Sequence, residues 1–183
     1  MGFKVDYSNA NSGGVPAGVY EAVILAAFED LSKTNKEFIN MPLIVRNDVE
    51  QPCKNQRIFH RIYKKVDPTQ NDAAHGGYPA TQIDSISKAA GLANGKQYAS
   101  LEEWLKDLER RPLRVKVKHE DYNGATMIKV DVFAADGSGI TATRFPDVKH
   151  VYKDDSGAGA GAAAKPLAGF TAAAAVDDDD IPF

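Results

Sequence analysis

Cations and aromatic rings alternate along residues 57–65, which read Arg-Ile-Phe-His-Arg-Ile-Tyr-Lys-Lys. Because successive side chains of a strand point to opposite faces, the two isoleucines share one face with His60. The opposite face then carries Arg57, Phe59, Arg61, Tyr63 and Lys65. Cations suit the phosphates of an unpaired nucleic-acid strand, and flat rings suit its bases. The segment therefore predicts a strand whose outer face binds single-stranded DNA of any sequence.

Two later segments extend this basic surface. Residues 113–119 and 125–133 alternate in the same way, and the Asn-Gly pair at 123–124 between them is a strong hairpin signal. In the first segment the face opposite the apolar residues holds Arg114, Lys116 and Lys118. In the second segment the outward residues include Lys129 and Phe133. We expect these five side chains to contact DNA together with the residues of 57–65.

Two other interpretations fit the same patterns. Solvent-facing strand positions often carry Lys and Arg, which protect sheet edges from pairing with other chains. Phe59 and Tyr63 could instead lie under helices as part of the core. Three cations interleaved with two rings favour DNA binding for 57–65, whereas the pattern of 113–119 alone does not decide between the two.

The expected elements come in an informative order. Strands are predicted over 19–28, 38–46 and 57–65, with a bulge or an edge position at Pro42. Residues 67–77 are expected to form a polar loop. Helices are predicted to follow over 81–90 and from 101 to Pro112, the second capped by Ser100 with Glu103. The hairpin 113–133 completes a mainly β fold. This order is that of an OB-fold, a five-stranded Greek-key barrel, with a helical insertion between strands three and four. Tyr20, Phe38, Trp104 and Phe145 are expected to be core residues.

Charge and composition divide the chain. The net charge is −3, yet residues 154–183 hold six aspartates and one lysine, which leaves residues 1–153 slightly basic. Residues 154–176 are rich in Gly and Ala and have few large apolar groups to offset the entropy of ordering. We therefore expect a DNA-binding domain over 1–153, a flexible linker over 154–176 and an acidic tip over 177–183.

The tip has the chemistry of a docking peptide. It reads Asp177, Asp178, Asp179, Asp180, Ile181, Pro182, Phe183. Ile181 and Phe183 can fill an apolar pocket, Pro182 limits the freedom lost on binding, and the aspartates attract a basic rim. A purely solvating acidic tail would lack the apolar end. The tip is predicted to bind partner proteins.

These features resemble two known families. An aspartate run closed by Ile-Pro-Phe is similar to the acidic tip of bacterial single-stranded DNA-binding proteins, which recruits replication, recombination and repair proteins. The start of the chain, Gly-Phe-Lys-Val-Asp-Tyr at 2–7 and Pro-Ala-Gly-Val-Tyr-Glu at 16–21, resembles phage-encoded single-stranded DNA-binding proteins. The resemblance implies an OB-like protein that protects single strands during phage DNA replication or recombination, with oligomeric state left open. A single-strand annealing or recombination accessory protein is the alternative.

Other kinds of chemistry find little support. The four histidines are widely spaced, and His60, between two isoleucines, is expected to be a satisfied, half-buried residue rather than a base. The one cysteine, Cys53, excludes an intrachain disulfide and a Cys-rich zinc site. We expect no enzyme activity, cofactor or metal; a nuclease would have to use Glu120, Asp131 and Asp136. No apolar run is long enough to span a bilayer, and the first residues lack the apolar core of a secretory signal. A cytoplasmic protein is expected.

Overall fold

The computed structural model describes residues 14–122, 125–137 and 139–152. Its contacts divide the chain into residues 1–151 and residues 152–183, and all of the described helices and strands belong to the first of these units. The expected linker and tip, 154–183, lie outside the described residues. None of the helices in the described ranges combines the length and apolar character needed to cross a bilayer.

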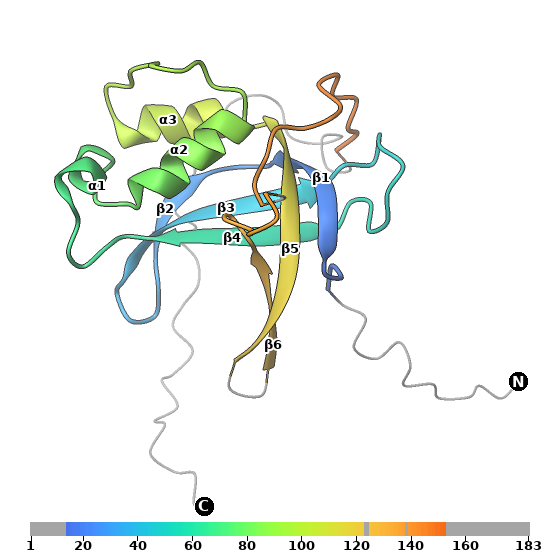
Figure 1. The fold of residues 1–183 in the computed structure, drawn as a ribbon, viewed down its shortest axis with the longest axis horizontal. Coiled ribbons are helices and arrows are strands. Elements are labelled where there is room, and N and C mark those ends of the chain that lie inside the picture. Colours follow the sequence, from blue (N-terminus) through green and yellow to red (C-terminus); the bar gives the residue numbers. More distant parts are fainter. Residues whose placement is uncertain (1–13, 123–124, 138, 153–183) are drawn as a thin grey trace, which may run out of the picture. The chain divides into compact units, whose positions relative to one another are not determined.

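The fold is mainly β, as predicted: an open, six-stranded antiparallel sheet with three helices (Figure 1). The strands are β1 (Gly18–Ile24), β2 (Phe28–Leu31), β3 (Glu37–Val45), β4 (Arg57–Tyr63), β5 (Pro112–Tyr122) and β6 (Ala125–Val130). The helices are α1 (Gln70–Ala74), α2 (Ala80–Ala89) and α3 (Leu101–Leu108). They lie between β4 and β5 in sequence, where the insertion was predicted, and Figure 1 shows them gathered at one end of the sheet.

β3 organises the sheet because it pairs along both of its edges. One edge pairs with β4, from Phe38 opposite Tyr63 to Ile44 opposite Arg57. The other edge pairs with β2 through its first half and with β1 through its second half. The other edge of β1 pairs with β5, and β5 pairs with β6. β4 and β6 contact each other as well, but no backbone pairing joins them within the described residues.

The first strand predicted over 19–28 is confirmed up to Ile24, where β1 ends, but its end is wrong, because a separate strand, β2, begins at Phe28. The two strands separate opposite Pro42 of β3, which has no N–H to donate to a neighbouring strand. The backbone N–H of Leu25 instead donates to the Pro42 carbonyl at 2.9 Å. The expected irregularity at Pro42 therefore falls on its partner strand.

Local sequence explains the helix boundaries. Ser100 caps α3 by accepting from the Glu103 N–H, and the Glu103 carboxylate accepts from the Ala99 N–H at 2.8 Å. α1 was missed, because its five residues lie within the expected polar loop 67–77. Thr69 and Asp72 nevertheless form a reciprocal capping box that starts this helix.

Apolar residues from the inner face of the strands and from α2 and α3 form one core. Its members include Ile24, Leu43, Ile62, Val115, Ile86 and Leu108. Burial of each large side chain contributes about 1.5–3 kcal/mol. Tyr20, Phe38 and Trp104 are buried as expected. The expectation that Phe145 is a core residue is wrong, because this residue is 48% exposed. The structure uses the Phe145 backbone instead, whose carbonyl accepts from buried Arg46 at 2.6 Å.

Candidate nucleic-acid interface

β4 shows the predicted alternation along its whole length. Its residues run exposed, buried, exposed from Arg57 to Tyr63, with Ile58, His60 and Ile62 on the inner side. Phe59 is 54% exposed and Tyr63 45% exposed. The rings are therefore not core residues, and the cations of the strand share their face.

The neighbouring strand supports this outer face. Phe38 of β3 lies directly opposite Tyr63, with the ring centroids 5.3 Å apart. The guanidinium carbon of Arg61 lies 5.1 Å from the centroid of the Phe38 ring. These contacts cover Phe38, which is 3% exposed although it is on the outer side of the sheet. This cation–π contact keeps the Arg61 guanidinium over the Phe38 ring on the outer side of the sheet.

A groove of about 590 Å³ runs between β4 and β6. It brings together six of the predicted residues: Phe59, Arg61, Tyr63, Lys118, Lys129 and Phe133. Phe133 lies in a turn beyond β6, because that strand ends at Val130 rather than at 133 as predicted. Its exposed ring nevertheless lines the groove.

Carboxylates neutralise two of these cations. Glu120 lies between Lys118, at 2.9 Å, and Lys129, with which it also forms an ion pair. Hydrogen bonds first from Lys129 and then from Lys118 lower the pKa of Glu120 to about 2. Lys118 is also 3.9 Å from Asp131. Arg57 and Arg61, by contrast, form no ion pair within the described residues.

Four predicted residues lie outside the groove. Arg57 is exposed at the start of β4, and Arg114 is half-buried and pairs through its backbone with Thr141. Lys116 forms an ion pair with Asp136 at 2.8 Å. Lys65 was wrongly placed on the strand, because β4 ends at Tyr63.

The Lys65 side chain has a structural role at the start of the helices. Its ammonium lies 2.7 Å from the carboxylate of Asp72, which also accepts from Thr69 and from the Ala80 backbone. These hydrogen bonds, that of Lys65 first, hold the pKa of Asp72 well below its ordinary value. Lys65 therefore links the end of β4 to α1 and α2.

Sequence reasoning missed several groove residues. Gln82 of α2 and Met127 of β6 line the groove, as do Glu120 and Asp131. Lys118 stands directly opposite Lys129 in the hairpin register, and Glu120 opposite Met127. The alternation of 113–122 already places Lys118 and Glu120 on one face. This alternation could have placed Glu120 beside Lys118, but it could not have shown that Glu120 also pairs with Lys129.

His60 also lines the groove, from the inner side of β4. It is 7% exposed, and its Nε2 atom is buried without a hydrogen-bond partner. The expectation that this histidine is satisfied is therefore wrong. Burial lowers the pKa of His60 to about 4, so the imidazole is neutral at pH 7.

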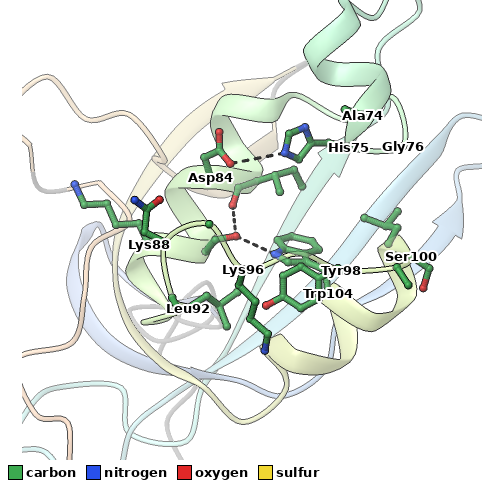
Figure 2. Close-up of a pocket in the computed structure, with 17 residues that line it drawn as sticks. Ala74, His75, Gly76, Asp84, Lys88, Leu92, Lys96, Tyr98, Ser100 and Trp104 are labelled. Atoms are coloured by element: carbon green, nitrogen blue, oxygen red, sulfur yellow. Dashed lines mark hydrogen bonds and ion pairs between the residues drawn. The ribbon is translucent and has the colours of Figure 1, made fainter.

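A second cavity, of about 940 Å³, lies among α2, α3 and the connecting residues 91–100 (Figure 2). Here His75 lies 3.8 Å from Asp84, and Ser87 also lines the cavity. The Ser87 hydroxyl accepts from Trp104 Nε1 at 2.8 Å and donates to the Ile83 carbonyl at 2.7 Å. Its proton is thus engaged with the backbone, and the arrangement joins α2 to α3 rather than activating a nucleophile. Across the described residues, no cluster of three potential metal ligands is found.

Comparison with known proteins identifies a family. No curated protein matches the sequence of the chain. A family model described as "Protein of unknown function (DUF669)" matches residues 3–161, which is most of the chain. This span includes all of the strands and helices of the described residues, together with the groove between β4 and β6. The chain therefore belongs to the DUF669 family.

Proposed function

We propose that this protein binds single-stranded DNA without sequence preference along the outer face of β4 and the adjoining groove. The observation that carries the proposal is the exposed row Arg57, Phe59, Arg61, Tyr63 on one strand face. Arg57 and Arg61 supply charge for phosphates, and Phe59 and Tyr63 supply rings for bases. Duplex DNA keeps its bases stacked inside, so the rings favour the unpaired strand.

The strand connections are consistent with an OB-type barrel, which we propose as the fold class. If β1 and β2 count as one interrupted strand, the pairing order is β4, β3, β1, β5, β6. The contact between β4 and β6 would close this series. In OB-folds the face of the second and third strands binds oligonucleotides. Those strands correspond here to β3 and β4.

The direct test is substitution of Phe59. Its stacking on a base contributes about 1–3 kcal/mol, so F59A should weaken binding to a fluorescent oligo(dT) about five- to a hundredfold. Fluorescence anisotropy measures the affinity. F145A removes a ring of similar exposure from the segment that follows the sheet, and it should change affinity less than twofold. Equal, small effects of the two substitutions would refute the assignment of the site.

We also propose that the acidic tip, residues 177–183, recruits replication or recombination proteins. The sequence supports this proposal through its apolar end behind four aspartates. Deletion of these seven residues should abolish the capture of such proteins in a pull-down and leave oligo(dT) binding intact or tighter. A deletion that weakens DNA binding would contradict the division of labour between domain and tip.

A further inference from the structure

The seam between β4 and β6 is an unusual place for a groove. Each strand pairs on its other side, β4 with β3 and β6 with β5, and the two are in contact. Residues of both sheet faces line the groove, with Phe59 and Met127 from the outer side and His60 and Val130 from the inner side. No backbone hydrogen bonds between strands join β4 to β6 in the described residues. The two strands can therefore move apart at the seam without the loss of such hydrogen bonds.

A buried polar atom without a partner lies at this seam. Two buried charged side chains elsewhere are well bonded: Glu21 accepts from Thr143 and from the Arg144 N–H, and Arg46 donates to several oxygens. Unpartnered buried atoms are few in the described residues, and Asn40 Oδ1 on β3 is another. His60 Nε2 has no partner. Its closest strand neighbours are apolar, since Ile58 and Ile62 share its face. Buried polar groups in folded proteins are nearly always hydrogen-bonded, so this atom requires an explanation.

We infer that the β4–β6 groove is a subsite for one nucleobase of the bound strand, and that a base N–H donates a hydrogen bond to His60 Nε2. The inference rests on the proposed function and names the part of the strand that enters this groove. The exposed rings of Phe59 and Phe133 line the groove and offer flat apolar surface for the base.

The chemistry favours a base over a phosphate in this position. Burial keeps the imidazole neutral, so it offers no charge to an anion, and in the tautomer with the proton on Nδ1 its Nε2 atom accepts a hydrogen bond. The inner part of the groove, with Ile128, Val130 and Val132, is apolar and would leave a phosphate poorly solvated. The phosphates then lie outside this inner part, near Arg57 and Arg61.

The test combines a protein substitution with a base modification. Oligo(dT) is compared with the same oligomer made from N3-methylthymidine, which keeps the ring and loses the N3–H donor. Wild-type protein should bind the methylated oligomer about fivefold more weakly, which is the effect of one hydrogen bond. H60L should bind unmodified oligo(dT) about fivefold more weakly and lose less than twofold on methylation. H75L, altered in the other cavity, should behave like wild type.

Stability provides an independent readout. Because H60L removes an unpartnered buried polar group, its urea midpoint should rise, which also shows that the variant folds. Wild-type protein that binds both oligomers equally would overturn the inference, and this result requires no variant. Equal losses on methylation in wild type and H60L would overturn it too. If wild-type protein does not bind oligo(dT) at all, the proposed function itself fails.

Discussion

Glu120 should limit the affinity of the proposed interface for DNA, because it holds two of the cations that could contact phosphates. It lies 2.9 Å from Lys118 and forms a second ion pair with Lys129. Arg57 and Arg61, both on β4, form no ion pair within the described residues, so these two cations are available to phosphates. Two phosphate contacts predict a slope of about −1.4 in a plot of log affinity against log salt concentration for a single strand.

The substitution E120Q removes the carboxylate charge and keeps the shape of the side chain. Lys129 is then released, and Lys118 keeps only Asp131 at 3.9 Å. One or two added phosphate contacts predict a slope of about −2 to −3, with tighter binding at low salt. Anisotropy titrations with oligo(dT) over a series of salt concentrations measure this slope.

The control E109Q removes the same charge from an exposed residue at the end of α3. It should leave the slope near the wild-type value, because no groove cation is released. If E120Q and E109Q have the same slope, Lys118 and Lys129 do not contact DNA, and the proposed interface reduces to β4.

Three further predictions concern stability, measured by urea unfolding. R46M should lower the free energy of unfolding by about 3–5 kcal/mol. Fully buried Arg46 pairs with Asp48 at 2.6 Å, and the substitution leaves that carboxylate without its charge partner. W104F should cost about 1–2 kcal/mol by leaving the Ser87 hydroxyl without its donor. The pKa of His60 is about 4 in the folded state and about 6.5 when unfolded, so the unfolded chain binds the proton first as the pH falls. Between pH 7 and pH 5 the free energy of unfolding should therefore fall by about 2 kcal/mol more for the wild-type protein than for H60L. An equal fall for both would show that His60 is not buried.

The exposed row on β4 could be predicted because its cause is local. One face of this strand packs on the core, and a side-chain period of two then fixes which residues are exposed. Ile58 and Ile62 are enough to place Phe59, Arg61 and Tyr63 on the opposite face. The same reasoning gave the buried residues of β5.

The remaining features depend on which residues meet across the sheet. The break between β1 and β2 follows from Pro42 on another strand, and the pairing of Glu120 with Lys129 follows from the hairpin register. Phe145 was misassigned because buried Arg46 binds its carbonyl, while the ring stays exposed. The orphan nitrogen of His60 follows from the meeting of β4 and β6, which no local pattern in the sequence indicates.

The affinity of the full chain for oligo(dT), relative to a duplex of equal length at the same moderate salt concentration, tests the central proposal most directly. Rings that stack on unpaired bases predict at least about fivefold tighter binding to the single strand, since one stacked base contributes about 1–3 kcal/mol. Equal affinity for the two would mean that charge alone drives binding, and it would contradict a role for Phe59 and Tyr63 in holding bases.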